Sequence, residues 1–355
     1  MNIPSKIRVM LVDDSAVVRR VLAEVLREHG FEVIAAVQDP LFALEVLKKD
    51  TPDVIVLDVE MPRMDGLSFL RQLMATHPIP VVMCSTLTTQ GAETTMAALS
   101  MGAAGVIAKP TQGLKEFLLR EDNGLIQAIR SASRCNMRNM RSADRTAKPV
   151  AQAVMTRAPF STTQKIVVLG LSTGGVQAIE RVLPLLPSDA PGMVIVQHMP
   201  AKFTATLAKR LDTLCAMEVR EARHGDRVLP GVALIAPGGF HTKLVRSGTQ
   251  YAIEVFEGPA VNHHRPSVDV LFRSTATVAG KNAVGVIMTG MGDDGARGMN
   301  ELHRAGAHTI AQDEASCVVF GMPKEAIKLG GIDEVVPLSS IAERILRSAA
   351  PAQKT

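Results

Sequence analysis

The sequence has no tryptophan, one tyrosine and four cysteines among its 355 residues. With so few of these aromatic rings, stacking against nucleic-acid bases is not expected. The cysteines lack the CxxC spacing of a zinc site and the arrangement of a disulfide framework, which favours reduced thiols in a cytoplasmic protein. No apolar run reaches the roughly 18 residues that a membrane-spanning helix needs, so no insertion into a membrane is expected.

The sequence also lacks a strong charge of either sign and a targeting segment. Its formal net charge is +4 and its pI is near 8.9, which is too weakly basic to predict a nucleic-acid partner. The opening letters MNIPSKIRVMLVDD bring two aspartates directly after a short apolar run, so no signal peptide is expected here. What the chain does have is length and an apolar content of 46%, enough for two separate cores.

Residues 7–130 alternate strand-like runs with helical patterns. The runs are IRVMLV, EVIAAV, DVIVLDV, PVVMCS and GVIAK, and the last expected helix lies near LKEFLLR and LIQAIR. Five strands in alternation with five helices predict a doubly wound, five-stranded parallel sheet that helices cover on both faces. We therefore place a first α/β domain at residues 1–128.

Residues 129–163 lose this alternation and are rich in basic side chains, which include Arg134, Arg138, Arg141, Arg145, Lys148 and Arg157. We interpret them as a solvated basic linker, with a nucleic-acid arm as the alternative. A second alternation of strands and helices fills residues 164–349, with a hairpin expected in HTKLVRSGTQYAIEVF. This pattern predicts a second doubly wound α/β domain, in which the sheet is mostly parallel.

Three aspartates stand where strands of the first domain end. Asp13 and Asp14 follow the first strand, and Asp58 closes the third. Because the carboxyl ends of parallel strands meet at one edge of a sheet, these side chains should lie together. Neighbouring carboxylates repel one another unless a hard cation neutralises them, and Mg²⁺, which prefers oxygen ligands, suits that role. Taken alone, Asp13 and Asp14 could instead be a helix N-cap pair.

Hydroxyl and ammonium groups should reach the same edge. Ser85 and Thr86 end the fourth predicted strand, and Lys109 ends the fifth. Such a set can accept a phosphoryl group on Asp58, because the metal ion and Lys109 offset its charge while a hydroxyl senses its presence. The plainer alternative makes Lys109 an ordinary surface lysine.

The motifs LVDDS, LDVEMPRMDG, CST and AKP follow these strand ends in order, and together they resemble the receiver domain of two-component response regulators. The resemblance implies that a histidine kinase phosphorylates Asp58. It also implies that Mg²⁺ is held by Asp14, Asp58 and the backbone carbonyl of Glu60, with Asp13 assisting.

The resemblance also bears on how the phosphoryl group is sensed. Of the two hydroxyls, Ser85 matches the switch position of the family better than Thr86 does. Many receivers carry an aromatic residue three positions before the lysine, where this chain has Val106. The sequence therefore does not support a switch that works through an aromatic ring.

In the second domain, the stretch LGLSTGG occupies a predicted strand-to-helix turn at residues 169–175. A phosphate-binding P-loop requires a lysine after its second glycine, where this chain has Val176. A dinucleotide fingerprint requires glycine in place of Ser172 and an acidic residue at the end of the next strand, which here ends in His198. GLSTG instead matches G-x-S-x-G, the turn that exposes a nucleophilic serine.

A histidine and two aspartates strengthen Ser172 as a candidate nucleophile. His198 lies at the end of the next strand, and Asp293 and Asp294 follow the strand AVGVIMTG. Serine, histidine and aspartate on three loops of one sheet edge can form a triad, in which the histidine deprotonates the serine and the carboxylate orients the histidine. The order Ser, His, Asp differs from the order Ser, Asp, His of α/β-hydrolases, so convergence on a different fold is expected.

Each of these residues also has a simpler interpretation. Ser172 could cap the helix that follows it, and His198 could be a hydrogen-bonded histidine at a strand end. The two aspartates could be turn residues between glycines. His241 and His264 are rival candidates for the base.

The stretches GLSTGG, VQHM, APGGFH, NHHRPSVDVLF and MTGMGDDGARGM are together similar to the catalytic domain of the chemotaxis receptor methylesterases, the protein-glutamate methylesterases. The similarity spans about residues 165–348. It implies that Ser172 is the nucleophile, His198 the base and Asp294 the orienting acid.

Further properties are implied by the same similarity. Backbone amides near Thr173 and Met291 would bind the oxyanion, and ester hydrolysis would need no cofactor. The expected substrates are glutamate methyl esters, and particular glutamines to be deamidated, on the cytoplasmic helices of methyl-accepting chemotaxis receptors. Phosphorylation of Asp58 is expected to activate the enzyme by relieving a block of receptor access by the receiver.

Two other classes stay open from the residues alone. A transcription regulator would bind DNA through its second half, where no helix-turn-helix pattern is found. A non-enzymatic adaptor that responds to phosphorylation would need no triad.

Overall fold

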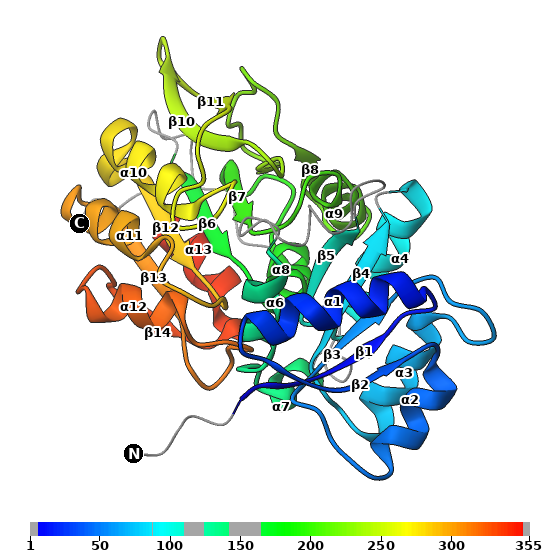
Figure 1. Cartoon of the computed structure of the whole chain (residues 1–355). Coiled ribbons are helices and arrows are strands. Elements are labelled where there is room, and N and C mark those ends of the chain that lie inside the picture. Colours follow the sequence, from blue (N-terminus) through cyan, green and yellow to red (C-terminus); the bar gives the residue numbers. More distant parts are fainter. Residues whose placement is uncertain (1–5, 87, 110–123, 142–164, 351–355) are drawn as a thin grey trace. The chain divides into compact units, whose positions relative to one another are not determined.

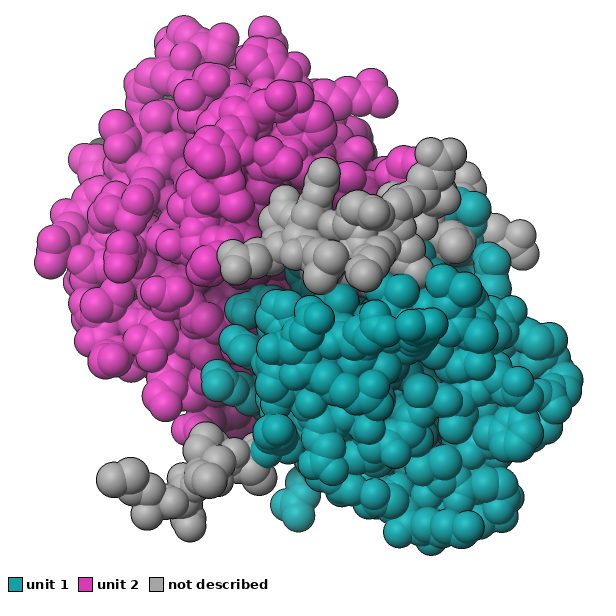
Figure 2. Space-filling view, in the orientation of Figure 1, with its two compact units in different colours: residues 1–143 teal, residues 144–355 magenta. Residues whose placement is uncertain are grey.

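The structure is a computed structural model that describes residues 6–86, 88–109, 124–141 and 165–350 (Figure 1). The chain divides between Ala143 and Asp144 into two compact units, which are coloured separately in Figure 2. In the described part of the chain, no helix is both long enough and apolar enough to cross a membrane.

The first unit contains a five-stranded parallel sheet, as the sequence predicts. The spatial order is β2-β1-β3-β4-β5, and every pairing in it is parallel. The strands are β1 (Arg8–Val12), β2 (Glu32–Val37), β3 (Val54–Asp58), β4 (Val81–Thr86) and β5 (Gly105–Lys109). All five residues of the central strand β3 are buried, because helices cover the sheet on both faces.

Four helices of this unit begin at the carboxyl edge of the sheet. They are α1 (Ala16–Glu28), α2 (Pro40–Leu47), α3 (Gly66–Thr76) and α4 (Thr89–Ser100). In each helix the side chain of the N-cap residue accepts a hydrogen bond from a backbone amide of the first turn. The N-cap residues are, in order, Ser15, Asp39, Asp65 and Thr88. The short strand-to-helix loops therefore place polar residues along the carboxyl edge of the sheet.

The first unit continues beyond residue 128. Helix α6 (Leu125–Ala132) packs against β3, β4 and β5, and α7 (Met137–Arg141) follows it. Met140 is buried, so residues that the sequence analysis assigned to the linker pack as part of this unit. The expected helix at LKEFLLR and the rest of the linker, residues 142–164, lie outside the described residues. The limits 1–128, 129–163 and 164–349 stay predictions.

The second unit is built on a seven-stranded sheet in which all pairings are parallel. The spatial order is β14-β13-β12-β6-β7-β9-β8. Its strands are β6 (Ile166–Leu171), β7 (Met193–Gln197), β8 (Glu218–Glu221), β9 (Val232–Ile235), β12 (Ala283–Ile287), β13 (His308–Gln312) and β14 (Glu334–Val336). The chain runs outward from β6 through β7 and later returns to β12 on the other side of β6. The strand order thus reverses between β6 and β12, where ligands bind in such sheets.

Helices cover both faces of this sheet. They are α8 (Gly175–Val182), α9 (Phe203–Asp212), α10 (Val268–Val278), α11 (Ala296–Arg304), α12 (Met322–Lys328) and α13 (Ile341–Ala349), with short 3₁₀ turns at Leu183–Leu185, Gly280–Asn282 and Leu338–Ser340. Helices α10, α11 and α12 lie side by side, yellow to orange in Figure 1. The core between sheet and helices includes Val168, Phe272 and Met299.

The predicted hairpin is confirmed as β10 (His241–Ser247) and β11 (Gln250–Phe256), an antiparallel pair that forms its own small sheet. The sequence analysis named no strand at β8 or β14 and no helix at α13. Both strands are short edge strands with charged residues, EVRE and EVV, so they lack the apolar run that marks a buried strand.

Candidate functional site

The first unit gathers its three aspartates at the carboxyl edge of the sheet, as predicted. Carboxylate oxygens of Asp13, Asp14 and Asp58 all lie within 4.8 Å of one another. Lys109 joins them, with Nζ 2.6 Å from Oδ2 of Asp13 and 2.7 Å from Oδ2 of Asp58. Three carboxylates and one ammonium leave two negative charges uncompensated, which fits a divalent cation with oxygen ligands.

The environment of Asp58 changes its acidity. Burial raises the pKa of Asp58 to about 6, although the neighbouring ammonium of Lys109 opposes this change. The buried negative charge of Asp13 adds to the rise. Because few positive groups compensate the charge of Asp58, any further positive charge in the pocket would stabilise its ionised form.

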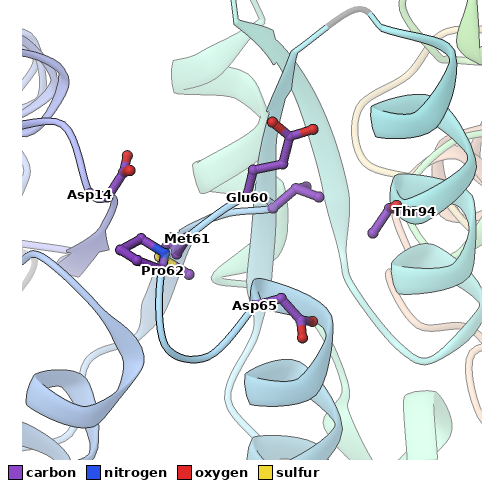
Figure 3. Close-up of a pocket in the computed structure, with 7 residues that line it drawn as sticks. Asp14, Glu60, Met61, Pro62, Asp65 and Thr94 are labelled. Carbon is purple, nitrogen blue, oxygen red and sulfur yellow. The ribbon is translucent and has the colours of Figure 1, made fainter.

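A pocket of about 570 Å³ opens beside these carboxylates. Figure 3 shows Asp14 on one side of it, and Glu60, Met61 and Pro62 on the loop that follows β3. Asp65, which caps α3, and Thr94 of α4 complete the lining that the figure labels. The loop after Asp58 thus borders the cavity, which is where the sequence analysis placed the Glu60 carbonyl as a metal ligand.

The predicted switch residues lie on β4, which pairs with β3, and on β5, the edge strand beyond it. Ser85 is fully buried in β4, and its hydroxyl donates a hydrogen bond to the carbonyl of Gly91 in α4 at 3.3 Å. Thr86 ends β4, but its side chain lies outside the described residues. Val106 is half-buried in β5, opposite Met83 of β4.

In the second unit, Ser172 lies in the sharp turn between β6 and α8. The two glycines of G-x-S-x-G allow neighbouring segments to pack closely there. A Cβ at Gly170 would lie 2.3 Å from Val268 Cγ1, and a Cβ at Gly174 would lie 2.5 Å from Val318 Cβ. Gly174 also has φ +77°, in the left-handed region that favours glycine. Both glycines of the motif are therefore needed for the close packing and the backbone conformation of this turn.

Hydrogen bonds hold this turn against the segment that follows β12. The amide of Ser172 donates to the carbonyl of Thr289 at 3.0 Å, and the hydroxyl of Thr289 donates to the carbonyl of Thr173 at 2.9 Å. The amide of Gly175 donates to the carbonyl of Ser172 at 2.8 Å. Ser172 therefore lies at the point where the strand order reverses.

His198 directly follows β7, the strand next to β6, and its ring contacts Asp294. Nε2 of His198 lies 2.8 Å from Oδ2 of Asp294. Leu171 and Gln197 are paired in the parallel ladder, so Ser172 and His198 each occupy the next position along neighbouring strands. Nδ1 of His198 is buried and has no hydrogen-bond partner among the described residues. The structure shows no hydrogen bond between this nitrogen and Ser172.

Asp294 is 1% exposed and accepts hydrogen bonds from five donors. Besides His198 they are Asn262 Nδ2 at 2.9 Å, Ser267 Oγ at 2.8 Å, the amide of Val268 at 2.7 Å and the amide of Asp269 at 3.1 Å. Burial alone would raise the pKa of Asp294, but these bonds and the charge of His198 lower it below its ordinary value. The carboxylate is therefore ionised and held in one orientation.

The rival candidates occupy other positions. Asp293 is exposed, whereas its neighbour Asp294 contacts His198. His241 is buried at the start of β10, where its Nε2 lies 2.9 Å from the carbonyl of Pro259. His264 stacks flat on His198, with 3.6 Å between ring centroids and an interplanar angle of 10°.

The stacked ring of His264 is presented by a tight turn. The backbones of Val261 and His264 exchange two hydrogen bonds, of 3.0 and 2.9 Å, and the two residues between them, Asn262 and His263, have φ +51° and +65°. Burial, followed by the charge of His198, lowers the pKa of His264 to about 3. At neutral pH, His198 therefore has an uncharged ring packed against its face.

Sequence reasoning missed most of the groups around Asp294. Asn262, Ser267 and Asp269 lie in the stretch NHHRPSVDVLF, which the sequence analysis used as a family motif without assigning roles to these residues. Ser267 precedes α10 and could have been noticed as an N-cap residue, but its hydroxyl bonds to Asp294 instead. Gln197 was also missed, although it immediately precedes His198.

Comparison with known families covers both units. The family described as CheB methylesterase matches residues 167–345, and the family described as response regulator receiver domain matches residues 9–118. These matches correspond to the seven-stranded and the five-stranded sheets respectively.

Curated relatives resemble the chain over almost its whole length. A protein-glutamate methylesterase/protein-glutamine glutaminase 2 of Dechloromonas aromatica is 58% identical over 350 residues, which is 96% of this chain and 98% of the relative. The protein of that name from Shewanella denitrificans is 55% identical over 352 residues, which is 96% of this chain and 99% of the relative.

A solved structure supports the fold of the second unit. The crystal structure of the Thermotoga maritima CheB methylesterase catalytic domain is 40% identical, with a TM-score of 0.51, and covers 52% of this chain and 98% of that one. Together with the full-length relatives, this likeness leads to one conclusion. The chain belongs to the CheB family of protein-glutamate methylesterases/protein-glutamine glutaminases, with a receiver domain followed by a methylesterase domain.

Proposed function

We propose that this chain is a phosphorylation-activated hydrolase in which Ser172 is the nucleophile, His198 the base and Asp294 the orienting acid. The observation that carries the proposal is the 2.8 Å contact between His198 and the buried Asp294, at the sheet edge where the Ser172 turn also lies. The membership in the CheB family supports the same assignment, because G-x-S-x-G and the residues around Asp294 belong to its matched region.

The proposed reaction has two steps through one covalent intermediate. Nδ1 of His198 takes the proton of the Ser172 hydroxyl, and Oγ forms a bond to the ester carbonyl carbon. When the tetrahedral intermediate collapses, the carbon–oxygen bond to the methoxy group breaks and methanol leaves with the proton from Nδ1. Water then adds to the carbonyl carbon of the acyl-enzyme and His198 takes its proton. The bond between Oγ and that carbon breaks as His198 returns the proton to Oγ, which restores the Ser172 hydroxyl and releases the glutamate side chain.

Asp294 serves the same base throughout. Because Nε2 of His198 is the nitrogen that contacts Asp294, the proton stays on Nε2 and the lone pair of Nδ1 is available to the serine. The carboxylate also stabilises the imidazolium that forms when Nδ1 accepts the proton. The stacked ring of His264 is uncharged at neutral pH and adds no repulsion to that cation.

The proposed oxyanion donors are the backbone amides of Thr173 and Met291. Thr173 follows the nucleophile, which is the usual position of one donor in a G-x-S-x-G turn. Met291 lies in the loop after β12, whose Thr289 is bonded to the Ser172 turn. Preorganised amides of this kind stabilise the charge of the tetrahedral intermediate.

The proposed substrates are glutamate methyl esters and particular glutamines on the cytoplasmic helices of methyl-accepting chemotaxis receptors. Deamidation follows the same steps, with ammonia in place of methanol as the leaving group. The cytoplasm is therefore the proposed location, and removal of methyl groups would contribute to receptor adaptation. No cofactor takes part in the proposed ester hydrolysis.

The first prediction concerns the nucleophile. Replacing Ser172 by alanine should lower methanol release from methylated receptor membranes on the order of 10³-fold or more, because no oxygen remains to form the acyl-enzyme. Ser274→Ala is the matched control, since this serine of α10 lies in the same unit and its hydroxyl bonds, among the described residues, to backbone groups of Leu244 and Leu271. Full turnover by Ser172→Ala would refute the assignment.

For the first unit, we propose that a chemotaxis histidine kinase transfers a phosphoryl group to Asp58. Asp14, Asp58 and the Glu60 carbonyl would hold Mg²⁺, with Asp13 assisting, and the bound ion would offset charge on the transferred group. Lys109 already contacts two of these carboxylates and would bind a phosphoryl oxygen. Ser85, with Thr86 beside it, would sense the new group through its hydroxyl, which now contacts the start of α4.

A second prediction tests activation. A small-molecule phosphodonor with Mg²⁺ should increase the rate of methanol release by the full chain. In Asp58→Asn the ratio of the rates with and without the donor should be one, because no carboxylate accepts the phosphoryl group. Equal stimulation of both proteins would contradict activation through Asp58.

A third prediction concerns the metal site. Protons compete with Mg²⁺ for Asp58, whose pKa is about 6, so the carboxylate is lost as the pH falls through that value. Mg²⁺ should therefore bind about tenfold more weakly at pH 5 than at pH 8, as measured by calorimetric titration of the full chain. Asp58→Asn, which cannot titrate at this position, should bind weakly and show a smaller change. An affinity independent of pH in the unaltered chain would rule out Asp58 as a ligand.

A further inference from the structure

Gln197 is a buried polar residue between the proposed nucleophile and base, and no role has yet been assigned to it. It is the last residue of β7 and is 3% exposed. Its Nε2 donates one hydrogen bond to the carbonyl of Ser172 at 2.9 Å and another to the carbonyl of His198 at 3.1 Å. One side-chain amide thus joins the main chains of both residues.

The chemistry of the contacts determines the orientation of this amide. Both partners are carbonyl oxygens, which only accept hydrogen bonds, so the NH₂ group must face them. The reverse orientation would place the amide oxygen against two carbonyl oxygens. Both donors of Gln197 are therefore used on the two segments that carry Ser172 and His198.

The other end of the same amide is unsatisfied. Oε1 of Gln197 is buried and has no hydrogen-bond partner among the described residues. A buried acceptor without a partner lowers the stability of the folded state, and a leucine of similar size would avoid that cost. A glutamine at this position is therefore poorly explained by stability alone.

The turn after Ser172 leaves room for this amide. A Cβ at Gly175 would lie 2.0 Å from Oε1 of Gln197, closer than real contacts allow. The backbone of Gly175 does not have a positive φ, so the reason for glycine here is space and not conformation. Gly174 thus provides a backbone with positive φ, whereas Gly175 provides space for the side chain of Gln197.

We propose that Gln197 is a positioning residue that sets the separation of Ser172 and His198 by bridging their main-chain carbonyls. This inference rests on the proposed function, since it assumes that these two residues react with each other. The carbonyl of Ser172 accepts from both Gly175 and Gln197, which fixes the turn from two directions. His198 is fixed by the second bond and by its amide, which donates to the carbonyl of Leu171 at 3.0 Å.

The consequence for the reaction is geometric. Proton transfer needs Nδ1 of His198 within hydrogen-bond reach of the serine oxygen. The ring is held at Nε2 by Asp294, while the serine is carried by the turn. Without the bridge the two segments could shift relative to each other, and a displacement of about 1 Å in such a pair can lower the rate about 10²-fold.

The test compares three variants of the full chain on methylated receptor membranes. Gln197→Leu keeps the size of the side chain and removes both donors. It should lower kcat about 10²-fold with KM unchanged, because substrate binding does not involve the bridge. Inactivation by an organophosphorus reagent that phosphorylates the serine oxygen should slow in parallel. Gln197→Glu, which replaces the NH₂ group by oxygen, should be at least as slow.

Gly175→Ala tests the same bridge from the other side. Its new methyl group would lie 2.0 Å from Oε1 of Gln197 and 2.8 Å from Cβ of Leu171, so it should displace the amide and also lower kcat. In the double variant Gly175→Ala/Gln197→Ala, the loss should be well short of the product of the two single losses, because the groups act as a unit. Thr275→Val is the matched control, since it removes a buried hydroxyl bonded to Leu271 at 2.8 Å in α10 and should leave kcat unchanged.

Folded fraction is measured for each variant by thermal unfolding followed by far-ultraviolet circular dichroism, and rates are referred to folded protein. If Gln197→Leu does not fold, the kcat of Gly175→Ala is used to test the inference. The inference is overturned if either variant, when folded, keeps the kcat of the unaltered chain, or if the losses multiply. Ser172→Ala distinguishes a failure of the proposed function from a failure of this inference. If Ser172→Ala is active, the proposed function is wrong. If Ser172→Ala is inactive while Gln197→Leu is fully active, only this inference is wrong.

Discussion

The carboxylate of Asp294 is the interaction on which the catalytic unit depends. Five donors from two segments converge on its two oxygens: His198, and four groups of residues 262–269, among them Asn262, Ser267 and the first amides of α10. A carboxylate buried without such donors would be neutral, and then it could neither orient nor stabilise His198. The packing of α10 against β6, through Val268 and Gly170, thus also supports Asp294, the carboxylate that holds His198, the proposed base.

The two units use the same edge of a parallel sheet for opposite electrostatic purposes. Asp294 and Asp58 are both buried, yet the pKa of Asp294 is lowered while the pKa of Asp58 is raised to about 6. The difference lies in their partners. The charge of Asp294 is stabilised by the donors that surround it. Asp58 shares one ammonium with Asp13, so added positive charge would stabilise its carboxylate further. The first arrangement suits a fixed orienting group, and the second suits a site that binds a cation and accepts a phosphoryl group.

Much of the fold and many site positions could be predicted from the sequence, because strand ends are local features. Apolar runs predict where β1, β3, β6 and β7 end, and a parallel sheet brings those ends to one edge. The donors to Asp294 could not be predicted, since they depend on how the loop before α10 folds. The stacking of His264 depends on a turn with two residues at positive φ, of which only Asn262 is a residue type that favours it. The role that we propose for Gln197 could not be predicted either, because it depends on hydrogen bonds to two backbone carbonyls, which leave no pattern in the sequence.

The most direct test of the central claim is the pH dependence of kcat for methanol release by Asp294→Asn beside the unaltered chain. An asparagine of nearly the same size can hydrogen-bond to His198 but carries no charge and can favour the other tautomer. We expect kcat to fall on the order of 10⁴-fold near neutral pH. Transfer of a phosphoryl group to Asp58 should be unaffected, which would show that the first unit remains intact. A variant that keeps most of its kcat across the pH range would contradict the account.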